Sequence, residues 1–281
     1  MTVSELYRRT KAELEALGNE AAPFESAALI QNVCGFSRSD LIINPNAEAE
    51  DGWIQKIGGL VKQRAEGVPL QYLLGEWSFL GSVFKVGQGV LIPRDDTEVA
   101  VEAACEFLKK RRNAEILDLC SGSGIIAVTL KKLFPDSSVT ALEISPAALS
   151  YLKENAKLNR ADIEIIGGDV FSDFEKFSNA RFDLIISNPP YIKTDDIASL
   201  QREVQFEPKL ALDGGADGLD FYRTITKNWS RKLKSGGMLI FELGENEADA
   251  ARRLMLEAGF TDIRTHPDLG GTYRAINGTM P

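Results

Sequence analysis

The feature that most constrains this chain is an alternation of short apolar segments with amphipathic ones through residues 114–243. The apolar segments are rich in Ile, Leu and Val, and the stretches between them have helical periodicity. Continuous apolar strands between amphipathic helices are typical of a mostly parallel sheet covered on both faces. We therefore expect an α/β fold with ligands bound beyond the C-terminal strand ends. The expected strands are 114–120, 137–143, 163–168, 183–188 and 237–243.

The chain before this alternation has a different character. Leucines recur at near-helical spacing from Leu6, and further helical segments follow Pro23 and begin near Trp53, which predicts a small helical bundle. Such a bundle either presents a partner-binding surface or is a structural cap. Residues 75–93 alternate apolar and polar side chains between glycines, which predicts a β-hairpin joining two domains. A helix is expected over 97–112.

A glycine-containing turn follows the first strand of the alternation. The turn reads Cys120, Ser121, Gly122, Ser123, Gly124, and glycines between a strand and a helix let the backbone approach a ligand closely. Glu143 ends the next strand, about 20 residues downstream, where a carboxylate can accept hydrogen bonds from a ribose diol. The pattern favours a nucleoside-type ligand over a turn that serves packing alone.

Two classes of nucleoside ligand compete for this turn. Gly122, Gly124 and Ala127 fit the dinucleotide fingerprint G-x-G-x-x-A, which would indicate a nicotinamide-dependent oxidoreductase. A site for S-adenosylmethionine uses a similar turn and places an acid before the glycines, facing the cationic methionine part. Asp118 stands there, and Asp169, after the third strand, can hydrogen-bond the adenine amino group. An oxidoreductase requires neither acid.

The most specific motif follows the fourth strand and reads Asn188-Pro189-Pro190-Tyr191. Two prolines cannot continue a central strand, and they leave carbonyl groups free. The Asn188 amide and the Pro189 carbonyl can both accept hydrogen bonds, and Tyr191 offers a flat face. Two acceptors that hold the hydrogens of a planar –NH2 orient its weak lone pair for attack on a methyl group. The group is a side-chain amide or the amine of a base.

With both motifs in place, the chain resembles the class I S-adenosylmethionine-dependent methyltransferases, and more narrowly the protein-(glutamine-N5) methyltransferases of release factors, the HemK/PrmC family. Further matches lie at 67–75, in Leu91-Ile92-Pro93-Arg94-Asp95-Asp96-Thr97-Glu98, and at 207–219. The resemblance implies a Rossmann-like seven-stranded sheet, S-adenosyl-L-methionine as cosubstrate with S-adenosyl-L-homocysteine as product, and methylation of the Gly-Gly-Gln glutamine of class 1 peptide chain release factors. It also implies three regions: a helical substrate-recognition domain at 1–75, a β-hairpin linker at 76–94 and the methyltransferase domain at 95–281.

The resemblance assigns roles to individual residues. Asn188, Pro189 and Tyr191 would be catalytic, and with Pro190 they would hold the substrate amide, near Arg94 and Thr97 at the mouth. The implied cofactor residues are Asp118, Cys120, Ser121, Gly122, Ser123, Gly124, Glu143, Asp169, Val170 and Asn188.

Three positions depart from the family pattern. Glu143 stands where the family usually has Asp, and Asp95 replaces the usual Pro. Val170 stands where an aromatic residue often stacks on adenine, which predicts weaker cofactor binding. None of these changes removes a reactive group.

Composition limits the alternatives. The formal charge of −9 argues against an adenine-N6 nucleic-acid methyltransferase, whose base flipping needs a basic groove, and against direct nucleic-acid or membrane partners. A glutamine methyltransferase of a ribosomal protein stays open. Three separated cysteines and the lone His266, in a loop-like context, give no metal site. We expect a cytoplasmic monomer, and a non-catalytic binding protein is disfavoured by the intact motifs.

Overall fold

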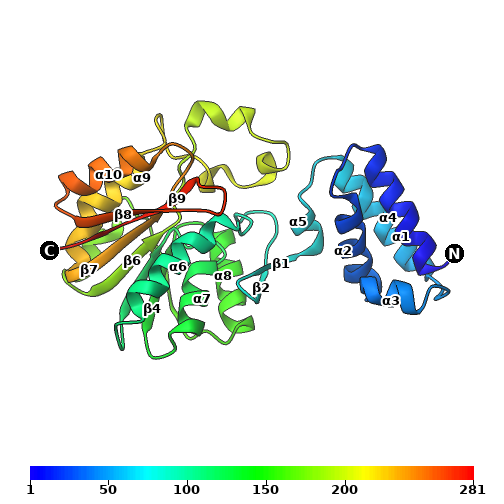
Figure 1. The fold of residues 1–281 in the computed structure, drawn as a ribbon, viewed down its shortest axis with the longest axis horizontal. Coiled ribbons are helices and arrows are strands. Elements are labelled where there is room, and N and C mark those ends of the chain that lie inside the picture. The colour runs from blue at the N-terminus through cyan, green and yellow to red at the C-terminus, as the bar shows by residue number, and fades with distance from the viewer. The chain divides into compact units, whose positions relative to one another are not determined.

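The computed structural model describes residues 1–281 and divides into two compact units. Unit 1 comprises residues 1–76 together with 201–206, and unit 2 comprises residues 77–200 together with 207–281. Segment 201–206 therefore belongs by its contacts to a unit whose other residues are far from it in sequence. Figure 1 shows the elements of both units.

Unit 1 is helical, as the leucine spacing predicts. Thr2 caps its first helix through a capping box with Glu5, and Leu6, Leu14, Leu29 and Ile30 are fully buried. Arg64 ties the segment to the bundle, because its guanidinium bonds both the buried Glu25 and the partly exposed Glu203 of the segment. The helices are α1 (Val3–Ala16), α2 (Ala22–Cys34), α3 (Arg38–Ile43), α4 (Asp51–Ala65) and α5 (Leu70–Leu74), with the short 3₁₀ turn η3 (Val204–Phe206).

Unit 2 is built on a seven-stranded sheet in the order β5-β4-β3-β6-β7-β9-β8. Strands β3 to β7 run parallel, and β9 pairs antiparallel with both β7 and β8. The strands are β3 (Glu115–Leu119), β4 (Ser138–Glu143), β5 (Glu164–Gly167), β6 (Phe182–Ser187), β7 (Leu233–Glu242), β8 (Thr261–Pro267) and β9 (Tyr273–Thr279). A separate hairpin of β1 (Glu76–Phe79) and β2 (Ser82–Lys85) precedes them.

Helices cover both faces of the large sheet, and the central strands β3, β4 and β6 are buried on both sides, as their continuous apolar sequences predict (Figure 1). One face carries α6 (Asp96–Leu108), α7 (Ile125–Leu133) and α8 (Pro146–Leu158). The other carries α9 (Asp220–Thr224), its π-helical continuation η5 (Ile225–Trp229) and α10 (Ala248–Glu257). Short 3₁₀ turns complete the unit: η1 (Asp173–Lys176), η2 (Thr194–Ser199), η4 (Lys209–Ala211) and η6 (Ser230–Lys232).

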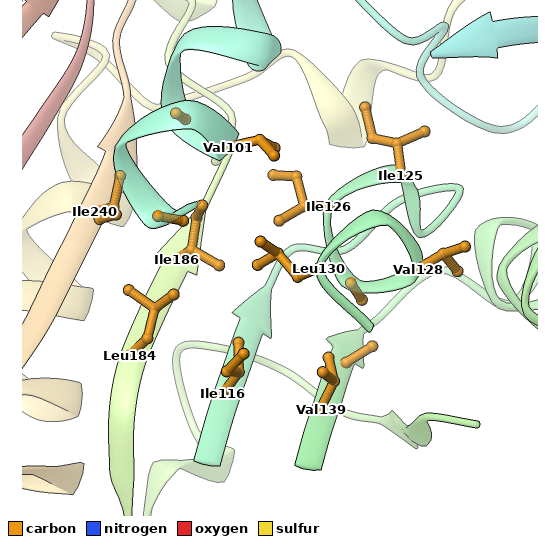
Figure 2. Close-up of a cluster of buried hydrophobic side chains, with 14 of the residues drawn as sticks. Val101, Ile116, Ile125, Ile126, Val128, Leu130, Val139, Leu184, Ile186 and Ile240 are labelled. Carbon is orange, nitrogen blue, oxygen red and sulfur yellow. The ribbon is translucent and has the colours of Figure 1, made fainter. Parts of the chain in front are cut away.

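The apolar layer under α6 and α7 fixes the helices on the sheet. Figure 2 shows Ile116, Leu184, Ile186 and Ile240 pointing from the strands toward these helices, with Val101 on α6. Each of the five is 1% exposed or less. Alternate strand residues point to the opposite face, where Leu117, Ile185 and Leu239 meet Trp229 and Met255 in the second apolar layer.

Most sequence expectations for this unit are confirmed. The five expected strands are β3 to β7, and Ser145 caps α8 with Pro146 at its first position. The helix expected over 97–112 ends at Leu108. The loop expected around His266 is wrong: that residue lies in β8, with Nε2 2.6 Å from Asn277 Oδ1.

Candidate functional site

A cavity of about 400 Å³ lies in unit 2 and is lined by residues that follow the C-terminal ends of the parallel strands. Its position is where the sheet order predicts it. From β3 the chain adds β4 and β5 on one side and then β6 and β7 on the other, and ligands bind where the strand order reverses in this way. Its size is within the range of small-molecule sites. The expected site residues on its wall are Arg94, Thr97, Cys120, Ser121, Gly122, Ser123, Glu143, Asp169, Val170, Asn188 and Pro190.

The glycine turn presents backbone to this cavity. Gly122 has φ of 55°, in the left-handed region, and a Cβ built there would meet no atom within 4 Å. Gly124 has φ of 84°, and a Cβ there would come within 2.2 Å of Leu152 Cδ1. The first glycine therefore leaves room on the ligand side, whereas the second permits close packing of α7 on α8.

Glu143 joins the turn to the next strand end. Its Oε2 accepts from the backbone N of Gly122 at 2.8 Å, and its Oε1 accepts from the backbone N of Ser145 at 2.7 Å. The side chain is almost buried, yet the residue lines the cavity. Each carboxylate oxygen keeps a second lone pair for a ligand hydroxyl.

Asp118 lies beneath the turn and is absent from the cavity wall. The residue is fully buried inside β3, and its Oδ2 accepts from the backbone N of Ala127 at 3.1 Å. Burial raises the pKa of this carboxyl to about 8, and its Oδ1 has no hydrogen-bond partner. This geometry lets Asp118 tie β3 to the start of α7.

The loop after β5 contributes an aromatic pair that the sequence analysis missed. Val170 is 5% exposed, and its carbonyl accepts from Trp229 Nε1. Phe171 is 43% exposed and lines the cavity together with Phe221, with ring centroids 4.8 Å apart in an edge-to-face arrangement. The aromatic surface that position 170 lacks is thus provided by the next residue. The only sequence signal was an apolar ring in a loop after a strand end.

The Asn-Pro-Pro-Tyr segment follows β6 directly. Asn188 lines the cavity, and its Nδ2 donates to Thr97 Oγ1 at 3.3 Å. Pro189 is buried and, like Gly124, is absent from the wall. Tyr191 also lies off the wall, packed against the apolar layer of the other face, and burial raises its pKa.

Arg94 is held at the cavity by a second residue that had no assigned role. Glu207 bonds the Arg94 guanidinium and accepts from the backbone N of Ile92 at 3.0 Å. Its side chain is 1% exposed, and burial raises its pKa. The segment before α6 is therefore fixed by a carboxylate more than a hundred residues away in sequence. Glu207 lies in segment 207–219, one of the stretches on which the family resemblance rests. That resemblance was the only feature of the sequence that pointed to this residue.

Comparison with known proteins identifies the family. Residues 5–75 match the PrmC N-terminal domain family, and residues 92–205 match the methyltransferase small domain family. The chain is 40% identical over 280 residues to the release factor glutamine methyltransferase of Geobacter sulfurreducens, covering 99% of this chain and 97% of the relative. The chain belongs to the release factor glutamine methyltransferase family.

A second relative supports the family, and a solved structure supports the fold. The release factor glutamine methyltransferase of Clostridium acetobutylicum is 34% identical over 280 residues, covering 98% of each chain. The crystal structure of a methyltransferase from Pyrococcus furiosus has a TM-score of 0.52 at 17% identity and covers 72% of this chain and 90% of that one. The second likeness concerns the fold alone, and it supports the class I methyltransferase fold of unit 2.

The site residues fit the cosubstrate of this methyltransferase family. Gly122 leaves open space beside exposed backbone, Glu143 keeps free acceptor positions for a diol, and Phe171 offers a ring to a flat base. The structure has no group of three or more His, Cys, Asp and Glu side chains that could hold a metal ion. No helix is both long and apolar enough to cross a membrane.

Proposed function

We propose that this chain transfers the methyl group of S-adenosylmethionine to the N5 side-chain amide of the glutamine in the Gly-Gly-Gln motif of class 1 peptide chain release factors. The observation that carries the proposal is the Asn188 amide at the cavity wall, with its nitrogen turned to Thr97, in a chain that belongs to this family. That orientation leaves Oδ1 as an acceptor for a substrate –NH2.

Asn188 Oδ1 and the Pro189 carbonyl hold the two hydrogens of the substrate amide in this scheme. Holding both hydrogens orients the nitrogen lone pair, which is otherwise delocalised into the amide, toward the electrophile. Bound S-adenosylmethionine supplies an electrophilic methyl group on a sulfonium. No strong base is needed, because the proton is lost after the nitrogen has become positively charged. Pro190, on the cavity wall, shapes the pocket for the amide, and Tyr191 packs behind this segment.

The remaining expected roles complete the proposal. The backbone of 120–124 lines the cosubstrate, Glu143 accepts from its ribose, and Asp169 with Val170 meets its adenine. Arg94 and Thr97 lie toward the substrate. Residues 1–75 recognise the release factor, residues 76–94 link the two domains, and residues 95–281 perform the transfer. The enzyme works in the cytoplasm as a monomer and contacts no nucleic acid or membrane directly.

The test is mass spectrometry of a purified release factor after incubation with this protein and S-adenosylmethionine. One methyl group is expected on the wild-type factor and none on a factor whose Gly-Gly-Gln glutamine is changed to Ala. A parallel arm offers ribosomal proteins and adenine-containing nucleic acid. Methylation of those alone would overturn the proposed substrate.

Asn188→Ala tests the proposed activation. We expect kcat to fall about 100-fold or more, the scale of losing one placed transition-state hydrogen bond, while the cosubstrate dissociation constant changes less than about threefold. Normal turnover by this variant would contradict the two-acceptor scheme.

A further inference from the structure

Three polar residues lie in one row directly above the apolar layer under α6. Ile186 of β6 pairs with Ile240 of β7, and the last pair of this ladder is Ser187 with Phe241. The next residues along the two strands are Asn188 and Glu242, which alternation places on the same face as the two isoleucines. Figure 2 shows Ile186 and Ile240 of this apolar layer.

The third member of the row comes from the helix above. Val101 belongs to the same apolar layer, and Thr97 precedes it by one helical turn, on the same face of α6. Thr97 is fully buried, and its Oγ1 accepts from Asn188 Nδ2. A buried hydroxyl also has one hydrogen to donate, and that hydrogen needs an acceptor.

Glu242 is the acceptor next to Thr97. The residue is 1% exposed, its Oε2 is buried without a hydrogen-bond partner, and Thr97 is the hydroxyl that hydrogen-bonds its carboxyl group. A buried carboxylate with an unsatisfied oxygen costs stability, and such groups concentrate at functional sites. The proposed methyl transfer gives Glu242 no role.

We propose that Glu242 is a positioning residue that acts through Thr97 to set the amide orientation of Asn188. The carboxylate takes the hydroxyl hydrogen of Thr97, so the hydroxyl oxygen faces Asn188 only as an acceptor. Asn188 must then turn Nδ2 toward Thr97 and Oδ1 toward the substrate amide. Without this constraint the amide of Asn188 can turn over and present a donor where an acceptor is required. The inference rests on the proposed function.

We call this chain of hydrogen bonds from Glu242 through Thr97 to Asn188 the relay. The titration of Glu242 makes the relay depend on pH. Burial raises the pKa of Glu242 to about 7, against the hydrogen bond from Thr97 that lowers it. The charged groups facing it are Asp96, which raises its pKa, and Arg274 and Arg94, which lower it, while Tyr191 lies beside it. Once protonated, Glu242 itself has a hydrogen to donate and no longer fixes the hydroxyl of Thr97. We therefore expect kcat to rise with pH through about 7.

The test compares Thr97→Val, Thr97→Ser, Glu242→Gln and the double variant Thr97→Val/Glu242→Gln with release factor as substrate. Thr97→Val keeps the shape and removes the hydroxyl, so kcat should fall about 10-fold, the worth of one hydrogen bond. Thr97→Ser should stay within about threefold of wild type. Glu242→Gln should lower kcat and flatten its rise near neutral pH. Glu102→Gln, an exposed change on the same helix, is the matched control.

The kcat of the double variant decides whether Glu242 acts through Thr97. If Glu242 acts through Thr97, adding Glu242→Gln to Thr97→Val lowers kcat no further, since neighbours that act as one unit are non-additive. Fully multiplicative losses, or a normal kcat for Thr97→Val, would overturn the relay. S-adenosylmethionine affinity, measured by titration, confirms that each variant is folded. If Thr97→Val does not fold, the pH profile of Glu242→Gln decides, and a profile identical to wild type refutes the relay. Failure of the wild-type protein to methylate any release factor would instead refute the proposed function.

Discussion

Replacing Glu143 with Gln tests how the turn and the cosubstrate site depend on one side chain. Both carboxylate oxygens of Glu143 accept backbone hydrogens, at 2.8 Å from Gly122 N and 2.7 Å from Ser145 N. The carboxylate therefore closes the glycine turn and caps the loop before α8, with lone pairs left for a ribose diol. Gln has nearly the same shape but only one acceptor oxygen.

The expected loss of affinity follows from the number of acceptor oxygens that each side chain offers. The amide oxygen of Gln can serve one backbone N–H, but its –NH2 must face the other, which leaves a nearly buried donor without a partner. Hydrogen bonds to charged groups contribute about 1.5–3 kcal/mol each. Because bound cosubstrate also loses an acceptor for one ribose hydroxyl, we expect its dissociation constant to rise between about 10-fold and 100-fold, or about 1.4–2.8 kcal/mol.

Isothermal titration with S-adenosylmethionine and with S-adenosylhomocysteine measures the effect. At saturating cosubstrate, kcat should fall less than about threefold, because Glu143 does not touch the substrate amide in the proposed scheme. Glu154→Gln makes the same charge change on the exposed side of α8 and should leave binding unchanged. Affinity within about twofold of wild type for Glu143→Gln would refute the ribose role.

Three further predictions concern separate parts of the chain. Phe171→Ala should raise the S-adenosylmethionine dissociation constant about 10-fold by titration, whereas Phe171→Tyr should not; equal losses would contradict a stacking role. Arg64→Ala leaves Glu25 buried without its partner and should lower the free energy of unfolding of unit 1 by about 3 kcal/mol in urea, against about 0.5 or less for the exposed Arg9→Ala. Folded Asp118 keeps its proton up to about pH 8 and the unfolded chain loses it near 3.8, so the folded state binds more protons between these values and stability falls as pH rises. The free-energy advantage of Asp118→Asn over wild type should thus grow by about 1.4 kcal/mol per pH unit between about pH 5 and about pH 7, and parallel urea curves would refute it.

The strands could be predicted from sequence where they are buried on both faces. β3, β4, β6 and the C-terminal half of β7 have the continuous apolar runs that this environment imposes. β5, at one edge of the sheet, has only Ile165 and Ile166 as large apolar residues, and both are half-buried. β8 is half exposed at the sheet edge and contains Asp262, Arg264 and His266, so its sequence resembles a loop. In β9, Asn277 and Gly278 interrupt the apolar residues. β9 is specified by pairing with β7, and β8 by pairing with β9, which no local pattern reveals.

The candidate site was predictable to the extent that it follows strand ends. Residues 120–123 of the turn, Glu143 and Asn188 follow this rule, and all line the cavity. Glu207 and Glu242 escaped because their partners, Arg94 and Thr97, are distant in sequence. Asp118 was expected at the ligand, but it lies within β3 instead of after it. Glu143 is the last residue of β4 and faces the cavity, whereas Asp118 is one residue short of the end of β3 and supports the turn.

The polar row and the apolar layer beneath it are held in place by the same three structural elements. Asn188, Glu242 and Thr97 stand one step above Ile186, Ile240 and Val101 on the same three elements. A cavity made below, as in Ile240→Ala, would cost about 2–5 kcal/mol and let β7 shift, so it would disturb the site as well as the core. Substitutions within the row remove hydrogen bonds and leave the apolar layer intact. Only they can separate the contribution of the site to transfer from the contribution of the core to folding.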